Sequence, residues 1–138
     1  MSSEKTFEAA LRVCSSIRTA SDIASRLPIK PSRLVEKDSA SPTTRTPRAA
    51  SDARWILDSG LADATPIEDH IHSFVRLLEQ HAESFKKLPD DCEIDVWCTI
   101  SSSEKFAGFS VDWQLIERLA AYHVGLVFSV YAGQPKDS

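Results

Sequence analysis

Two carboxylates and an indole ring alternate along the segment 93–97, at the spacing that places them on one face of a β-strand. Glu93 and Asp95 would then lie about 7 Å apart, which suits acid–base chemistry or contact with a basic partner. Trp97 adds an aromatic group of the kind enriched at the centres of protein interfaces. We therefore predict a partner-binding site at Glu93, Asp95 and Trp97, joined by the acidic pair Glu68 and Asp69. The alternative is an ordinary solvent-facing strand.

Histidines at positions 70, 72 and 81 raise the question of a metal site. On a helix, His70 and His72 point about 200° apart, so they cannot share one ion. Asp69 or Glu68 could pair with His72, but no HExxH motif and no third ligand follows. We predict no metal and no cofactor, and we interpret these residues as solvated or capping histidines.

The three cysteines, Cys14, Cys92 and Cys98, form no CxxC motif. Cys92 and Cys98 would lie roughly 20 Å apart on one strand, so they cannot form a disulfide with each other. We expect all three to be buried and reduced. The alternative is a nucleophile, Cys14 or Cys98, activated by His123. Because the sequence has no GxSxG motif and no glycine-rich phosphate loop, we predict no catalytic residues.

The net charge of −4 is spread unevenly. Residues 30–54 contain six basic and three acidic side chains, whereas the rest of the chain contains ten basic and seventeen acidic ones. An acidic body argues against general nucleic-acid binding and is compatible with a basic protein partner. The alternative interpretation of the acidic body is a mildly acidic surface that only maintains solubility.

The elements that must position these residues can be read from periodicity. The cleanest alternation of apolar and polar residues covers 92–101, and we expect a central strand there that the helices before and after it cover. Further strands are expected at 7–15, 54–58 and 126–131, and a short one could be added at 33–36. Trp55 and Trp113 are expected to serve packing, with part of each ring at the surface.

Three helices are predicted from capping residues and apolar spacing. The first covers about 20–27, with Thr19 and Asp22 as a capping box. The second begins after Thr65, which we expect to cap it with Glu68, and runs to about 88. The third covers about 111–122, capped by Ser110.

The fold class is therefore α+β: a single domain with about four strands in a mainly antiparallel or mixed sheet, covered by three helices. Two segments, 11–29 and 96–126, share a strand–helix plan that suggests a two-fold β-α-β pseudo-repeat. The domain is expected to cover 7–131, with a flexible N-terminus at 1–6, a mobile basic loop at 36–53 and a tail at 132–138.

The order of several short motifs carries a family resemblance. The chain contains LPIKPS at 27–32, WILDS at 55–59, EDHI at 68–71, CEIDVWC at 92–98, GFS at 108–110 and VFSVY at 127–131. This pattern resembles the bacterial family called domain of unknown function 4279. It departs from that family at Pro28, where a glycine is expected, and in the glycine-poor loop 36–54. The resemblance implies a fold but no reaction. By analogy, small proteins of this kind often accompany toxins as immunity proteins.

These observations favour a non-enzymatic protein-binding module, in the form of an immunity or antitoxin-type protein that neutralises a basic partner. The rival is a small enzyme or ligand-binding domain, with Glu93, Asp95 and His70 or His72 around a pocket beside the sheet. A third reading is that the basic loop grips nucleic acid. We expect a cytoplasmic protein because no signal peptide and no apolar run of about 20 residues is present.

Overall fold

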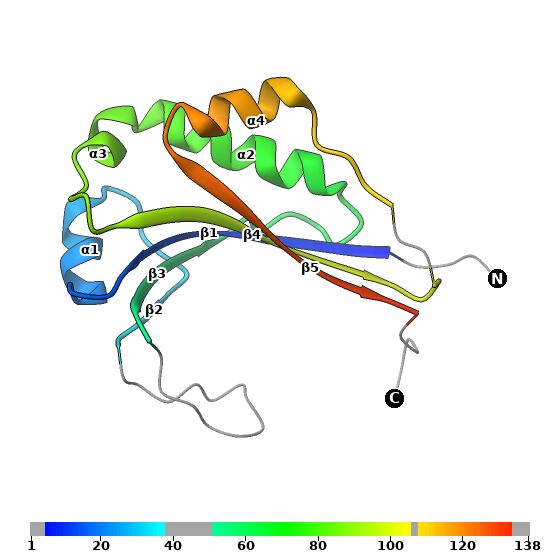
Figure 1. The fold of residues 1–138 in the computed structure, drawn as a ribbon, viewed down its shortest axis with the longest axis horizontal. Helices are drawn as coiled ribbons and strands as arrows, with labels where there is room; N and C mark the ends of the chain where they lie inside the picture. Colours follow the sequence, from blue (N-terminus) through cyan, green and yellow to red (C-terminus); the bar gives the residue numbers. More distant parts are fainter. Residues whose placement is uncertain (1–4, 38–50, 106–107, 134–138) are drawn as a thin grey trace.

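In the computed structural model, which describes residues 5–37, 51–105 and 108–133, five strands and four helices follow one another along the chain (Figure 1). Their order is β1 (Lys5–Ser15), α1 (Ala20–Arg26), β2 (Arg33–Val35), β3 (Ala53–Asp58), α2 (Ile67–Gln80), α3 (Ala82–Lys86), β4 (Glu93–Ser102), α4 (Trp113–Ala120) and β5 (Val124–Ala132). The predicted α+β class is confirmed. Its counts of four strands and three helices are each one too low, because β2 forms and the second helix is divided.

The strands form one mixed sheet in the order β2-β3-β1-β4-β5. Among the described strands, β4 and β5 are the one pair of hydrogen-bonded neighbours that run parallel, and α4 supplies the crossover that a parallel neighbour requires. β1 lies at the centre, with β3 on one side and β4 on the other. The expectation that the strand at 92–101 is central is therefore only partly right, since β4 has two neighbours but lies one strand from the edge.

In both units of the suggested pseudo-repeat the two strands run in the same direction, but only in the second unit are they neighbours in the sheet. β4, α4 and β5 form a β-α-β unit whose strands are neighbours. β1 and β2 are also parallel to each other, because both are antiparallel to β3, but β3 lies between them. In the first unit β3 is therefore inserted between the two parallel strands. The sequence pattern could not show this insertion.

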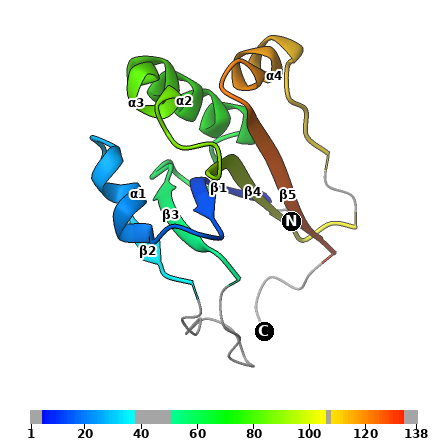
Figure 2. The same ribbon diagram turned by 60° about the vertical axis from the view of Figure 1, so that its left-hand side comes forward.

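All four helices lie on one face of the sheet (Figures 1 and 2). α2 packs on β1 and β4, α4 lies beside α2 against β5, and α1 contacts β1, β2 and β3. The sheet contributes the alternate residues of each strand to the core, including Leu11, Val13, Trp55, Val96 and Cys98, which are all fully buried. The opposite face carries no helix of the described residues. None of these helices is long and apolar enough to cross a membrane.

The predicted helix at about 65–88 is divided at His81, where the backbone leaves the helical region (φ −119°, ψ 38°). Leu78 and Phe85 stay buried on either side of the break. Because the apolar spacing continues through His81, periodicity alone predicts one helix.

The N-termini of α2 and α4 are capped differently from the prediction. α2 has Pro66 at its N-cap and no side-chain capping bond, so Thr65 and Glu68 do not form a capping box. α4 begins after Asp112 rather than Ser110, again without a side-chain cap. In contrast, Thr19 caps α1 as predicted, by accepting a hydrogen bond from the backbone N–H of Asp22.

The edges of the predicted basic loop contact the body of the protein. Ala20 and Ser21 donate their backbone N–H groups to the Glu36 carboxylate at the start of α1. Lys37 donates to the carbonyl of Ser16, and Ala53 is already a buried residue of β3. Residues 38–50, and with them most of the predicted mobile loop, lie outside the described residues, as do 1–4 and 134–138.

Candidate functional site

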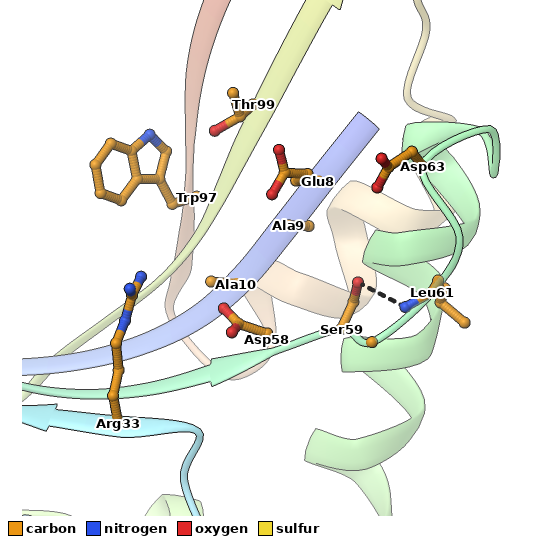
Figure 3. A pocket seen from close by; sticks show the side chains of 11 residues that line it. Glu8, Ala9, Ala10, Arg33, Asp58, Ser59, Leu61, Asp63, Trp97 and Thr99 are labelled. Carbon is orange, nitrogen blue, oxygen red and sulfur yellow. Dashed lines mark hydrogen bonds between the residues drawn. The ribbon is translucent and has the colours of Figure 1, made fainter. Parts of the chain in front are cut away.

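A pocket of about 420 Å³ opens on the helix-free face of the sheet, and we call it the carboxylate pocket (Figure 3). It is lined by residues of β1, β2, β3 and β4 and by the loop after β3: Glu8, Ala9, Ala10, Arg33, Asp58, Ser59, Gly60, Leu61, Asp63, Trp97 and Thr99. Four strands and a loop, drawn from distant parts of the sequence, thus converge on one concave surface.

Strand register creates the hollow. Ala10 lies opposite Asp58 on β3 and opposite Trp97 on β4, and Glu8 lies opposite Thr99. Side chains that are neighbours across strands lie about 5 Å apart at their Cβ atoms, so the small Ala10 leaves space between two larger groups. The pocket therefore depends on a small residue of the central strand.

The loop after β3 is fixed to the sheet by backbone hydrogen bonds. Ser59 N–H donates to the carbonyl of Ala9 at 3.0 Å, and Phe7 N–H donates to the carbonyl of Asp63 at 2.8 Å. Between them Gly60 has φ +72°, in the left-handed region that glycine adopts without a steric penalty. These contacts place Asp58, Ser59 and Asp63 beside Glu8 of β1 (Figure 3).

The pocket carries three carboxylates that form no ion pair with another described residue. Glu8, Asp58 and Asp63 are exposed, and no ion pair involves any of them within the described part of the chain. Arg33 is the one cationic side chain in the lining. The described residues contain no group of three or more histidine, cysteine or acidic side chains that could hold a metal ion. The arrangement suits a cationic ligand larger than a single ion.

His70 supports the pocket from behind. Its Nδ1 lies 2.7 Å from Ser59 Oγ, while Nε2 is buried and has no hydrogen-bond partner among the described residues. Burial lowers the pKa of His70, and the backbone of Thr65 and the nearby carboxylates offset this only in part. The ring is therefore neutral at neutral pH. The prediction of a solvated or capping role is wrong for His70, which is fully buried.

The other two histidines are placed differently. His72 is partly exposed and lies near Arg118 of α4, with 3.3 Å between Nε2 and Nη1. His81 is at the junction of α2 and α3, where it makes no side-chain capping bond. The structure therefore does not bring His70, His72 and His81 together at one site.

Of the predicted contact residues, Trp97 lies in the carboxylate pocket, but its N–H group and one face of its ring already have neighbours. Its indole N–H donates to Ser129 Oγ at 2.9 Å, and the Arg12 guanidinium carbon lies 4.5 Å from the ring centroid. Arg12 in turn makes two hydrogen bonds to Asp95, of 2.7 and 2.8 Å. Asp95 is therefore committed to an internal ion pair, while Trp97 keeps a surface toward the pocket.

Glu93 and Asp95 line a second pocket of about 820 Å³, at the other end of β4. Lys86, Tyr122 and His123 also contribute to its lining. The predicted contact face is thus divided between two pockets, with Trp97 in the first and the two carboxylates in the second. The rival combination with His70 or His72 is not assembled, because the histidine of the second pocket is His123.

Glu68 and Asp69 lie on α2, in the helix layer, and so are separated by the sheet from the face that carries Trp97. Glu68 accepts a hydrogen bond from the backbone N–H of Asp112 at 2.8 Å, which anchors the segment before α4. Asp69 is exposed. The structure therefore does not join these two residues to the predicted strand site.

The cysteines are free, with Cys14 and Cys98 buried and Cys92 partly buried. Burial raises the pKa of Cys14 to about 11 and that of Cys98 to about 12. Both thiols stay protonated near neutral pH, which makes them poor nucleophiles. The only hydrogen bond from either thiol within the described residues joins Cys98 to the carbonyl of Val96, so His123 activates neither of them there.

Sequence reasoning missed Glu8, Asp58 and Asp63, the carboxylates that line the pocket with Trp97. The alternation in residues 7–15 places Glu8 on the polar face of β1, which was a usable signal. Its neighbours depend on strand order and register, and neither is encoded in the period of a single strand.

A family model described as "Domain of unknown function (DUF4279)" matches residues 4–133. No curated protein and no solved structure matches the chain.

Proposed function

The chain belongs to the family of the domain of unknown function DUF4279, and from that premise we propose that it is a non-enzymatic protein-binding module with a basic partner. In the form that we propose, it acts in the cytoplasm as an immunity or antitoxin-type protein. Binding to the basic surface of a toxin would neutralise it.

One observation carries the proposal: three carboxylates without an ion pair in the described residues face one pocket whose wall includes Trp97. A lysine or arginine side chain of a partner would meet three carboxylates in a lining that holds one cation, Arg33. The aromatic wall suits such a group because cations are attracted to the indole ring. Glu93 at the other end of β4 extends the acidic surface along the same face of the sheet.

Magnitudes favour a protein over a small cation. An ion pair between exposed groups stabilises a complex by about 0.2–1 kcal/mol, and an exposed cation–π contact by about 0.5–1 kcal/mol. A single cation in the carboxylate pocket would therefore bind weakly. A protein partner would add buried apolar contacts and further charge pairs around it, which is how specific interfaces reach useful affinity.

The same charges disfavour a nucleic acid as the partner. The carboxylate pocket and the net charge of −4 repel phosphates, whereas they attract a basic protein and accelerate its association. The basic loop that could oppose this lies largely outside the described residues.

The test is a double charge reversal, Glu8→Lys/Asp58→Lys, compared with Glu104→Lys/Glu117→Lys. Both doubles change the net charge equally, and Glu104 and Glu117 are exposed residues outside the pocket. Proteins of the native host captured by each tagged variant would be identified by mass spectrometry, and the retained protein would be purified for calorimetry. We expect one basic protein to bind the wild type and the control, and to lose at least tenfold in affinity for the pocket variant.

Two results would overturn the proposal. One is that the wild type retains no protein even at low ionic strength, where attraction between charges is least screened. The other is a partner that binds both double variants equally, because the carboxylate pocket would then not be its site.

The rival function, a small enzyme or ligand-binding domain, has one observation in its favour. Ser59 lines the carboxylate pocket and is hydrogen-bonded to His70, as a nucleophile is to its base. Among the described residues no carboxylate is hydrogen-bonded to His70, so the pair lacks the charged third group of a catalytic triad. An ester-hydrolysis screen of wild type and Ser59→Ala separates the two functions. We expect no Ser59-dependent turnover, and a rate that Ser59→Ala abolishes would favour the enzyme.

A further inference from the structure

The two edges of the sheet are built very differently. β2, at one edge, has three residues, including an exposed Arg33, and follows Pro31 closely. A short edge strand with a charge and a nearby proline resists pairing with other chains. β5, at the other edge, has nine residues, no charge and no proline. It has none of these protective features.

β5 is also continuous and exposed. Its pairing with β4 runs without interruption from Val124 to Ala132, so no bulge turns the edge away from solvent. In the described part of the chain no other strand pairs with its outer side. Val127, Phe128, Val130 and Tyr131 are exposed by 36–50%. A long apolar edge of this kind offers free backbone N–H and C=O groups to an incoming strand.

An apolar surface on the neighbouring helix continues this edge. α4 lies against β5 on the helix side of the sheet (Figure 2) and exposes Trp113 by 65% and Ile116 by 46%. Phe109 stacks on Phe128, with ring centroids 4.9 Å apart. Trp113 is expected to pack with part of its ring at the surface, and the exposed part is the larger one. Together these side chains and β5 form what we call the β5–α4 surface.

We propose that the β5–α4 surface binds a second copy of this chain, with the two β5 strands antiparallel about a two-fold axis in one ten-stranded sheet. A two-fold interface must be self-complementary, and an uncharged apolar strand meets this condition because no like charges face each other. The basic partner proposed above would find no carboxylate on β5. The carboxylate pocket lies on other strands and stays open in the dimer, so this inference stands apart from the proposed function.

The available area fits a modest dimer. Aromatic side chains bury roughly 150–250 Å² each, so the exposed fractions of Phe109, Trp113, Phe128 and Tyr131 amount to roughly 300–480 Å² per copy. A standard interface buries about 800 Å² per partner. Ile116, Val127, Val130 and the strand backbone would supply most of the remainder. We therefore expect a dissociation constant on the order of micromolar.

The first test is sedimentation velocity over a concentration series that spans this range. We expect the wild type to pass from monomer to dimer, and Val130→Lys/Tyr131→Lys to remain monomeric. The matched control is Leu34→Lys, which adds a lysine at an exposed apolar residue of the opposite edge and should dimerise normally. A wild type that stays monomeric throughout, or a dimer that survives the double substitution, would overturn the proposal.

The second test does not depend on a destabilising charge. In an antiparallel two-fold pair, residues at the middle of the strand face their own copies at a distance that a disulfide can span. Oxidation of Val127→Cys or Phe128→Cys should give a covalent dimer on non-reducing gels, while Leu34→Cys and the wild type should not. If neither β5 cysteine cross-links faster than Leu34→Cys, the strands do not pair as proposed.

Discussion

Arg12 connects two residues that the sequence places on a contact face. Its guanidinium makes two hydrogen bonds to Asp95 and lies over the ring of Trp97. The side chains of Arg12 and Asp95 are only 13% and 23% exposed, so both charges have lost much of their hydration. When one charge of a partly buried ion pair is removed, the protein is destabilised mainly because the remaining charge is left without a partner.

We expect Asp95→Asn to lower the free energy of unfolding by about 1–3 kcal/mol, because it leaves Arg12 without its counter-charge. Glu93→Gln is the matched control, since Glu93 is an exposed acidic residue of the same strand face and should change stability by less than about 0.5 kcal/mol. Urea denaturation followed by tryptophan fluorescence measures both. Equal effects would mean that Asp95 is as free as Glu93, contrary to the ion pair.

The second residue-scale feature is the buried neutral His70. Burial lowers its pKa in the folded protein below the value in the unfolded chain, which is about 6.5. Above that pH both states hold a neutral ring, and His70 adds nothing to the pH dependence of stability. Below it the unfolded chain binds a proton that the folded protein does not, so the free energy of unfolding falls as the pH falls.

We expect the wild type to lose stability between about pH 6.5 and 5 by more than a His70→Asn variant does, because the variant has no imidazole to protonate on unfolding. The variant should be less stable at pH 7.5 by about 1–3 kcal/mol, since the contact with Ser59 is altered in a buried site. Denaturant titrations at both pH values test this. The control is His123→Asn, an exposed position with φ +56° that asparagine tolerates. Parallel pH profiles for wild type and His70→Asn would contradict the expectation.

At the scale of elements, the two threonines that precede helices differ in what they do. Thr19 Oγ1 accepts the Asp22 N–H at 3.0 Å, so it satisfies one of the free donors of α1. Thr65 precedes Pro66, which holds the N-cap position of α2 without a side-chain bond. The sequence patterns of both sites look equally suited to capping, and only the backbone path separates them.

Thr19→Ala should therefore reduce the free energy of unfolding by about 0.5–2 kcal/mol, the usual effect of losing a capping oxygen. Thr65→Ala is the natural comparison, and we expect a change below about 0.5 kcal/mol. Thermal unfolding monitored by circular dichroism distinguishes the two. A larger loss for Thr65→Ala would show that α2 does depend on that hydroxyl.

Elements were predictable where their signal is local. The alternation in residues 92–101 and 7–15 predicted β4 and β1 because one face of each is buried. The break at His81 was missed because the apolar stripe from Leu78 to Phe85 crosses it unchanged. The short β2 was only suggested, since three residues carry too little periodicity to separate a strand from a loop.

At the scale of the whole molecule, the order of the strands gives their backbone amides unequal protection from hydrogen exchange. β1 is hydrogen-bonded on both sides and covered by α2, whereas β2 is a three-residue edge. Backbone amides in the most enclosed elements exchange with solvent only when the whole protein unfolds. Amides at the edges of a sheet exchange through local opening.

In native-state hydrogen exchange followed by mass spectrometry, we expect peptides from β1 and β4 to be the slowest and those from β2 to be the fastest of the sheet. At concentrations where the proposed dimer forms, β5 should be protected more strongly than in dilute protein. If β5 exchanges as fast at high as at low concentration, its edge is not covered. If the amides of β2 exchange as slowly as those of β1, the expected difference between the edge and the centre of the sheet is wrong.

The sequence by itself determined what depends on neighbours along the chain. Alternation and helical spacing placed four of the strands, the buried faces of β1 and β4, and three of the helices, because these periods follow from backbone geometry. The family resemblance, now confirmed over residues 4–133, came from short motifs in order. The absence of a glycine-rich or catalytic motif was also local information.

Only the tertiary structure decided which side chains meet. Register places Ala10 between Asp58 and Trp97, and it brings Arg12 against Asp95. As a result, the predicted contact residue Asp95 became part of an internal ion pair, while Glu8, Asp58 and Asp63 came to line the pocket. The physical reason is that cross-strand neighbours depend on the order and offset of strands, which burial across the whole core fixes and no single segment encodes.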